Sequence, residues 1–587
     1  MNRFQGINRF FNNIFEKTRY SENMFIIGLS IVVGLLTGLG AMGFRWLILT
    51  SKSFFFGSLP EATTVSGLSS EWFTPLIPML GGLLVGPIVY KFASEAKGHG
   101  VPEVMSAVAL KGGVIRPRVS IAKSIASAIC IGSGGSAGRE GPIVQIGSAI
   151  GSTIGQMFRL SGNRVKVLVG CGAAAGISAV FNAPIAGVIF ALEVILGDFT
   201  IKTFSPVILS SVIASVVSRS FLGNSPAFAV PEYALVSAWE VPMYMLLGVF
   251  TGVVSFIFIK ALYFAEDLFD GWKIPNMIKP AIGGLLLGLL GLKFPQVFAD
   301  GYEAVSAALH GEMVWTLMLV LVIGKVLATS FTLGSGNSGG IFAPSLFMGA
   351  MAGGFFGSVM NYLFPEITAP AAAYALVGMG AVVAGATHAT ITSIIIVFEM
   401  TGDYRIILPM MIATVFATQV ALRLNKDSIY TLKLSRKGIR LKAGRDVDLL
   451  SKIKVAEVMD VNYQSIPRHL SLTGIMRLMD DSTENTFPVT DSDKLYGILS
   501  FQDLRSVLIQ PVMPALIIAS DIATREVITI TIDDNLNDAL QKFGHKDLNM
   551  MPVVDKDDPT KLLGVLRRGD VMAAYNKRLV GKMAGGG

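Results

Sequence analysis

The chain has 587 residues, of which 52% are hydrophobic and only 15% are charged, so most of it must lie in a lipid bilayer. Its formal net charge of +7 fits basic loops at a membrane surface and gives no indication of a nucleic-acid partner. The two cysteines, Cys130 and Cys171, lie in apolar segments, and the five histidines are scattered along the chain. This pattern argues against a disulfide framework, a metal site and an enzyme's catalytic cluster.

Residues 1–20 carry apolar side chains at helical spacing, and basic residues lie between them. The apolar positions are Phe4, Ile7, Phe11 and Ile14. This pattern predicts an interfacial amphipathic helix, with the N-terminus on the cytoplasmic side.

Long apolar runs follow between about residues 24 and 424, and we assign residues 21–440 to a transmembrane domain. Glycine and proline cut the runs at 120–155 and 313–363 into pieces that are too short to cross a bilayer alone. Helices should therefore end at membrane depth, which is tolerated only where the free backbone groups are buried in protein or line a cavity.

Two of these interrupted segments are copies of each other. Residues 132–155, GSGGSAGREGPIVQIGSAIGSTIG, and residues 334–357, GSGNSGGIFAPSLFMGAMAGGFFG, share nine of 24 positions without a gap. The first copy carries Glu140, and a carboxylate at membrane depth is a candidate functional group. A broken apolar segment in each half of a membrane domain indicates a transporter's binding site.

Near residue 441 the composition becomes mixed and charged. We expect a linker at 441–454, two copies of a soluble α/β unit at 455–508 and 520–578, and a flexible tail at 579–587. Each copy contains an apolar strand with a central Pro-Val pair and a following Gly-centred strand.

Four motifs in the membrane region give a family resemblance. They are GHGVPE at 98–103, GREGP at 138–142, GIFAP at 340–344 and a late Tyr430. In this order they resemble the CLC family of chloride channels and chloride/proton exchangers, and the two C-terminal copies resemble a CBS pair.

The resemblance implies an all-α polytopic membrane protein with the CLC fold, built from two inverted repeats of broken and tilted helices and followed by a cytoplasmic α/β CBS pair. It also implies a homodimer with a separate pore in each subunit. The protein would be a multi-pass cell membrane protein with both termini cytoplasmic.

Helix ends within the membrane can replace the water around an anion, because their N–H groups are unpaired and the helix dipole is positive there. By resemblance, the anion-binding residues would be Arg139, Glu140, Gly141, Ile341, Phe342 and Tyr430. Glu140 would be the gate, since its ionised carboxylate can occupy an anion site and its neutral form can leave it.

Two positions depart from the family pattern. His99 stands where an anion-coordinating serine is common, and it either donates to chloride and takes part in the proton pathway with Glu140 or turns away to a backbone partner. Val194 stands where many exchangers have an internal proton-transfer glutamate. Its neighbour Glu193 lies about 100° further around a helix and cannot simply replace it.

In the CBS pair, Ser500 and Asp503 match a nucleotide-binding pattern, whereas the second copy has Asp570 but no hydroxyl three residues before it. The pair is then either an adenine-nucleotide site or a dimerisation module that binds nothing. No cofactor is required for transport.

The predicted function is transmembrane chloride transport gated by Glu140, with chloride, protons and the lipid bilayer as partners. Glu140 and His99 favour proton-coupled exchange, and Val194 favours a passive voltage- or pH-gated channel. A fluoride-selective relative is a further alternative, although Pro142 and Phe342 resemble the chloride-type pattern.

Overall fold

The computed structural model describes the chain as two compact units that divide between residues 437 and 438. The described residues are 22–58, 73–92, 97–228, 230–231, 233, 235–437, 439, 450, 453–480, 482, 484–492, 494–501, 503–504, 517–546 and 549–574. The predicted N-terminal helix at 1–20, the tail at 579–587 and most of the linker at 441–454 lie outside them.

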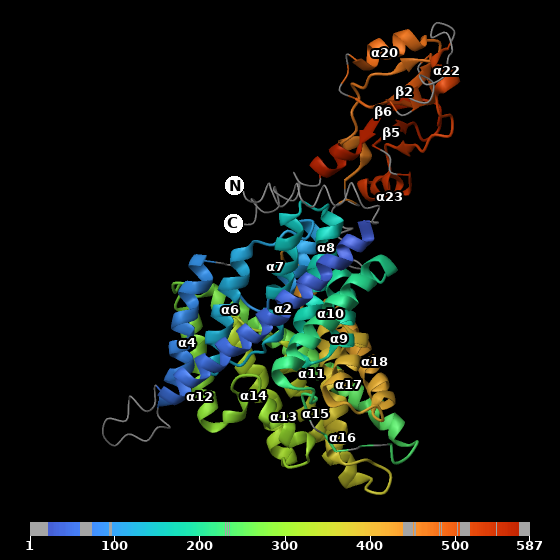
Figure 1. Ribbon diagram of the computed structural model, residues 1–587. Coiled ribbons are helices and arrows are strands. Elements are labelled where there is room, and N and C mark those ends of the chain that lie inside the picture. Colours follow the sequence, from blue (N-terminus) through green and yellow to red (C-terminus); the bar gives the residue numbers. More distant parts are fainter. Residues whose placement is uncertain are drawn as a thin grey trace. The chain divides into compact units, whose positions relative to one another are not determined.

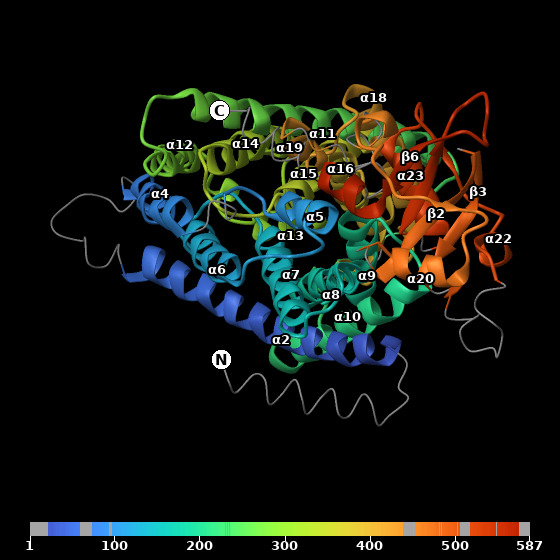
Figure 2. The ribbon, with the colours of Figure 1, turned by 90° about the horizontal axis from the view of Figure 1, so that it is seen from above.

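The first unit is helical (Figures 1 and 2). Its first half contains α2 (Glu22–Ser53), η1 (Phe54–Ser58), α4 (Leu76–Pro87), η3 (Ile88–Phe92), α5 (Val101–Leu110), α6 (Pro117–Gly132), α7 (Glu140–Met157), α8 (Gly162–Phe181), α9 (Pro184–Phe190), η5 (Ala191–Leu196) and α10 (Ile201–Leu222). Its second half contains α11 (Glu240–Gly271), α12 (Lys279–Lys293), η6 (Pro295–Val297), α13 (Tyr302–Leu309), α14 (Trp315–Gly334), α15 (Phe342–Leu363), α16 (Ala371–Thr387), α17 (Thr390–Thr401), α18 (Ile407–Leu424) and α19 (Thr431–Arg436).

The predicted helix breaks are confirmed. Helix α6 ends at Gly132 and α7 begins at Glu140, and α14 ends at Gly334 and α15 begins at Phe342. Within the described residues, seven helices are long and apolar enough to cross a membrane, and five apolar helices are shorter. Both broken segments are buried, as free backbone groups at membrane depth require.

The two repeats meet at equivalent residues. Gly138 and Gly340, which lie 202 positions apart, pair in antiparallel fashion and exchange N–H···O bonds of 2.8 and 2.6 Å. A contact between equivalent residues lies on a local two-fold axis. Figure 1 shows α7 and α15 extending from this region toward opposite faces of the unit, so the repeats are inverted.

Side chains around this axis make the same contact twice. The Ser127 and Ser338 hydroxyls lie 2.9 Å apart, and the Thr329 and Ser136 hydroxyls lie 3.1 Å apart. Ser127 and Thr329 are equivalent at the same spacing of 202, and so are Ser136 and Ser338. The first repeat therefore contacts the second as the second contacts the first, which is the property of a two-fold interface.

A pair of fully buried lysines follows the same symmetry. The Lys123 ammonium donates to the Gly98 carbonyl at 2.6 Å, and the Lys325 ammonium donates to the Val297 and Ala299 carbonyls at 3.0 and 2.9 Å. Both lysines have 0% of their surface exposed. A buried ammonium must have acceptors, and here they are the loops that lead into the short helices α5 and α13.

After α7 and α15 the spacing between equivalent residues becomes 206. Glu193 on η5 accepts from the N–H and hydroxyl of Thr392, at 2.8 and 2.7 Å, in the first turn of α17. Its equivalent Glu399 accepts from the N–H groups of Ile185 and Ala186, at 3.1 and 2.7 Å, in the first turn of α9. Each repeat thus supplies a carboxylate that caps a helix of the other.

Glycines allow the helices of each repeat to touch at the backbone. Gly147 on α7 faces Gly172 on α8, and their equivalents Gly349 and Gly378 join α15 to α16. A Cβ on either member of a pair would overlap the carbonyl group of the other. This close approach fixes the directions in which the N-termini of α7 and α15 point.

The second unit contains two copies of a three-stranded sheet. The first has β1 (Ile466–Pro467), β2 (Thr486–Asp491) and β3 (Lys494–Ser500), and the second has β4 (Ile530–Thr531), β5 (Met550–Val554) and β6 (Leu562–Arg567). In both copies the first strand is parallel to the second and the second is antiparallel to the third. The other elements are η8 (Val455–Glu457), α20 (Leu472–Asp480), α22 (Ala519–Ile522) and α23 (Leu536–Lys546), so the predicted α/β repeat is confirmed.

Candidate functional site

The Glu140 carboxylate lies where the N-termini of α7 and α15 meet, and only 2% of the residue is exposed. One carboxylate oxygen accepts from the Ala343 N–H at 3.5 Å, in the first turn of α15. The other accepts from the Tyr302 hydroxyl at 3.3 Å. The Glu140 carboxylate thus faces the dipole and the free N–H groups of a helix from the other repeat.

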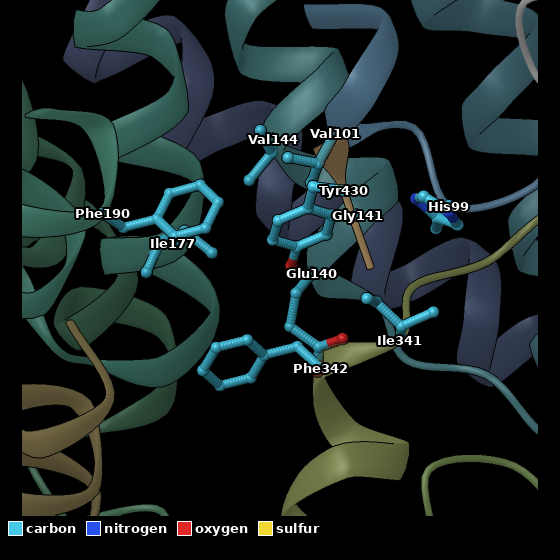
Figure 3. Close-up of a pocket in the computed structure, with 10 residues that line it drawn as sticks. All are labelled: His99, Val101, Glu140, Gly141, Val144, Ile177, Phe190, Ile341, Phe342 and Tyr430. Atoms are coloured by element: carbon cyan, nitrogen blue, oxygen red, sulfur yellow. The ribbon is translucent and has the colours of Figure 1, made fainter. Parts of the chain in front are cut away.

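A small pocket surrounds this carboxylate (Figure 3). Six of the seven predicted anion-binding residues line it: His99, Glu140, Gly141, Ile341, Phe342 and Tyr430. The remaining walls are apolar and come from Val101, Val144, Ile177 and Phe190. The sequence motifs therefore converge, although they are spread over more than half of the chain.

Backbone hydrogen bonds join a third loop to the broken segment of the second repeat, and a close backbone contact joins it to that of the first. The Gly98 N–H donates to the Asn337 carbonyl at 3.0 Å, and the Gly339 N–H donates to the Gly98 carbonyl at 3.3 Å. A Cβ on Gly141 would overlap the His99 carbonyl, so only glycine permits this approach. The loop that carries His99 is therefore fixed against the pocket by its backbone.

The His99 ring has one polar partner within the described part of the chain. Its Nε2 lies 3.4 Å from the Tyr263 hydroxyl, and that hydroxyl donates its proton to the Ile429 carbonyl at 2.7 Å. Tyr263 can then only accept, which favours the tautomer with the proton on Nε2. The buried Nδ1 has no hydrogen-bond partner there, and the ring centre lies 5.9 Å from that of Tyr430.

The partner of His99 is thus a tyrosine hydroxyl rather than the backbone. In this tautomer Nδ1 presents a lone pair, so His99 could donate to an anion only after a tautomer change or with a second proton.

Neither Glu193 nor Val194 on η5 supplies a free acid. Val194 has no titratable group, and Glu193 holds the start of α17 through Thr392. The expectation that Glu193 does not take the place of an acid at position 194 agrees with this geometry.

Arg139 lies outside the Glu140 pocket and lines a second cavity, of about 790 Å³, which we call the α13 cavity. Its guanidinium carbon lies 5.3 Å from the centre of the Tyr302 ring. Polar groups of this cavity belong to Lys52, Arg139, Gln296, Asp300, Tyr302, Glu303 and Glu312. Tyr302 lies outside the four sequence motifs, but the repeat spacing of 202 relates the motif at 98–103 to residues 300–305, which include it.

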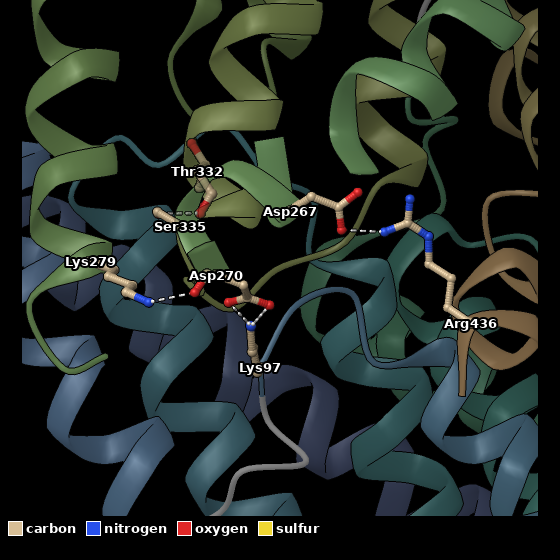
Figure 4. A network of polar contacts seen from close by, with 7 residues as sticks. All are labelled: Lys97, Asp267, Asp270, Lys279, Thr332, Ser335 and Arg436. Atoms are coloured by element: carbon tan, nitrogen blue, oxygen red, sulfur yellow. Dashed lines mark hydrogen bonds and ion pairs between the residues drawn. The ribbon is translucent and has the colours of Figure 1, made fainter. Parts of the chain in front are cut away.

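Ion pairs hold two pocket segments to the end of α11 (Figure 4). The Lys97 ammonium lies 2.9 Å from the Asp270 carboxylate, and the Arg436 guanidinium lies 2.6 Å from the Asp267 carboxylate. Lys97 precedes the His99 loop, and Arg436 ends α19, the helix that follows Tyr430. The aspartates are more than half exposed, so each pair contributes little energy and serves mainly to fix position.

In the second unit, the predicted nucleotide residues of the first copy bond to each other. The Ser500 hydroxyl and N–H both donate to Asp503, at 2.7 and 2.8 Å. This arrangement is a local cap at the end of β3, and it uses the two groups that would hold a ribose or phosphate.

The second copy has Arg567 in the position of that serine. Its guanidinium lies 2.8 Å from Asp460, 3.0 Å from Glu484 and 3.6 Å from Asp570. The hydrogen bond from Arg567 lowers the pKa of the Asp460 carboxyl below its usual range. Asp460 and Glu484 belong to the first copy, so Arg567 links the two copies. It does so from the position where the nucleotide-binding pattern would have a hydroxyl residue.

Comparison with known proteins agrees with this geometry. The family described as voltage gated chloride channel matches residues 81–422, and the CBS domain matches residues 455–510 and 519–577. A putative chloride channel protein, ClcB-like, from Ralstonia nicotianae is 34% identical over 415 residues, covering 70% of this chain and 97% of that protein. The H(+)/Cl(-) exchange transporter ClcA from Salmonella agona is 35% identical over 422 residues, covering 70% and 88%.

A solved structure shows the same fold. It is the crystal structure of a slow cyanobacterial Cl-/H+ antiporter, with a TM-score of 0.65 and 29% identity. The alignment covers 71% of this chain and 98% of that one.

Proposed function

The chain belongs to the voltage gated chloride channel family and transports chloride, and we propose that it does so as a chloride/proton exchanger gated by Glu140. The observation that carries this proposal is the buried Glu140 carboxylate at the meeting point of two helix N-termini. A carboxylate and a chloride ion compete there for the same donors, because both are anions that accept from unpaired N–H groups.

In the proposed mechanism, the ionised Glu140 carboxylate occupies the α15 N-terminus through its bond with Ala343. When a proton neutralises the side chain, its attraction to the helix dipole falls and the donors become available to an anion. Proton uptake and anion entry then belong to one step. When the anion leaves, the carboxylate can release its proton and return.

The anion would be held by partial charges. The proposed donors are the N–H groups around Gly141, Ile341 and Phe342 together with the Tyr430 hydroxyl, all at the walls of the same pocket. The nearest full cation of the motif, Arg139, lines the α13 cavity instead. Among the described residues no lysine or arginine lines this pocket, so it can bind chloride and still release it, as conduction requires.

Passive conduction is the second candidate. It is favoured by one observation, which is that η5 has Val194 and a helix-capping Glu193 where an internal proton-transfer acid would be expected. Exchange is supported by the resemblance to ClcA, which is named an H(+)/Cl(-) exchange transporter.

The two candidates differ in proton movement. In liposomes containing the purified protein, a chloride gradient should drive protons against their own gradient. Chloride flux with no proton movement would replace exchange by passive conduction. Glu140→Gln should abolish proton movement, whereas Glu366→Gln, at an exposed position after α15, should not. Proton pumping that survived Glu140→Gln would refute the gate.

The same liposomes test anion choice. We propose chloride rather than fluoride as the preferred anion, so chloride efflux should exceed fluoride efflux. A faster fluoride efflux would favour the fluoride-selective alternative.

Assembly and orientation complete the proposal. We propose a homodimer with one pore in each subunit, and both termini in the cytoplasm. Cross-linking in liposomes should give a dimer, and protease added outside intact cells should leave the C-terminal unit uncut.

A further inference from the structure

Tyr302 is the first residue of α13, and its side chain contacts the Glu140 carboxylate directly. The Tyr302 hydroxyl donates to a Glu140 oxygen at 3.3 Å. Two side chains contact its ring: the Arg139 guanidinium carbon lies 5.3 Å from the ring centre, and the Phe228 ring makes a T-shaped contact at 5.2 Å between ring centres. The ring contacts do not need the hydroxyl, although the hydroxyl also bonds to the Arg139 side chain.

The Tyr302 side chain lies between the anion pocket and the α13 cavity. Glu140 lines the pocket of Figure 3, and Tyr302 lines the α13 cavity. Their hydrogen bond is a direct link between these spaces. A Glu140 side chain that leaves the pocket toward the α13 cavity must break or move this bond.

The backbone that presents Tyr302 is also fixed. Gly301, with φ of 75°, makes the turn into α13. Lys325 holds the segment before this turn by donating to the Val297 and Ala299 carbonyls. A non-glycine residue would be strained at this φ, and a Cβ there would crowd the Phe347 ring at 2.6 Å. The hydroxyl is thus presented from a rigid support rather than from a mobile loop.

We propose that Tyr302 is a positioning residue for the gate, whose hydroxyl holds the ionised Glu140 carboxylate inside the anion pocket. This inference rests on the proposed role of Glu140. A hydroxyl bonds more strongly to an ionised carboxylate than to a neutral acid, so Tyr302 favours the blocking position of Glu140. Besides Tyr302, the groups that act on the Glu140 carboxylate are the backbone N–H groups of Glu140 and Ala343, the charges of Arg139 and Asp300, and the nearby Tyr430 side chain.

Tyr302→Phe removes the hydroxyl and keeps the ring contacts with Arg139 and Phe228. Without this donor, the neutral and released state of Glu140 should be reached at lower proton concentration. The midpoint of the pH profile of chloride flux should therefore move up by about one pH unit, which corresponds to a tenfold change in proton affinity and is typical for loss of a hydrogen bond to a charged group.

Tyr233→Phe is the matched control. The Tyr233 hydroxyl donates to the Leu309 carbonyl at 2.7 Å, at the last residue of α13, so this variant removes a hydroxyl that anchors the same helix at its other end. Its pH profile should match that of the wild type. An equal shift in both variants would assign the effect to anchoring of α13 and overturn the inference.

A double-mutant cycle separates positioning of the gate from a general effect. In a Glu140→Ala background the Tyr302 hydroxyl has no carboxylate to hold, so Tyr302→Phe should leave chloride flux and its pH profile unchanged. The same shift in both backgrounds would overturn the inference. If Glu140→Gln retains proton pumping, the gate itself is wrong; if only Tyr302→Phe fails to shift the profile, the gate stands and the role of Tyr302 is wrong.

Discussion

The contact between α7 and α8 gives a direct test of how the pocket is held. At Gly147, an added Cβ would overlap the Gly172 carbonyl and lie 2.8 Å from Thr37 Cγ2 on α2. The main obstacle is backbone, so it cannot be relieved by rotating a side chain. Gly147→Ala should therefore push α8 away from α7, the helix that begins with Glu140.

Gly28→Ala is the matched variant, because a Cβ at Gly28 would have nothing within 4 Å. Both glycines lie inside helices, where alanine is more favourable than glycine by about 1 kcal/mol. This gain is common to the two variants, and only Gly147→Ala adds an overlap that costs about 1–3 kcal/mol. Gly28→Ala should be neutral or slightly more stable than wild type, and Gly147→Ala should be less stable than Gly28→Ala by about that overlap cost.

Thermal denaturation in detergent, followed by the fraction of protein that stays monodisperse, measures this difference. Chloride flux should fall with Gly147→Ala even in the fraction that remains folded, because the start of α7 moves. Equal melting temperatures for the two variants would refute the argument that this glycine permits a backbone contact.

Two further predictions concern carboxylates other than the proposed gate Glu140, namely Glu193 and Asp460, the partner of Arg567. Glu193→Ala removes the cap of α17 and should lower stability by about 0.5–2 kcal/mol in the same denaturation assay. It should leave the ratio of protons to chloride unchanged, and a changed ratio would contradict a purely capping role. In the C-terminal unit, Arg567→Gln should lower thermal stability at neutral pH. Arg567 lowers the pKa of Asp460 from 3.8, so the stabilisation is present above that value and lost as the pH falls through the lower folded-state pKa. The difference between wild type and Arg567→Gln should therefore shrink below about pH 4, and a difference that is constant with pH would contradict the pairing.

The breaks in the helices could be predicted because their signals are local. Glycine and proline within an apolar run indicate where a helix ends, and the repeat at 132–155 and 334–357 contains them in both copies. The pocket residues followed from the same motifs and from resemblance. The sequence could not show that Arg139 lies outside the pocket. Although it is next to Glu140, its side chain lines the α13 cavity.

The helix caps that Glu193 and Glu399 provide for α17 and α9 could not be predicted in this way. The spacing between equivalent residues changes from 202 at Gly138 and Gly340 to 206 at Glu193 and Glu399, so a comparison without gaps loses the second pair. Apart from the Thr392 hydroxyl, their partners are backbone N–H groups, which have no sequence signature. Only the two-fold arrangement of the repeats shows that the carboxylate of one half reaches a helix of the other.

The same two-fold arrangement bears on why one carboxylate would be enough for a gate. Glu140 and Phe342 are equivalent residues, since each is the first of its helix and they lie 202 positions apart. The structure thus offers two equivalent positions and places a titratable group at only one. Apart from its own backbone N–H, the donors to the Glu140 carboxylate are Tyr302 and Ala343, and both come from the second repeat. A carboxylate from one half that is held by donors from the other responds to any movement between the halves, and the phenylalanine opposite it has no charge with which to compete for the anion.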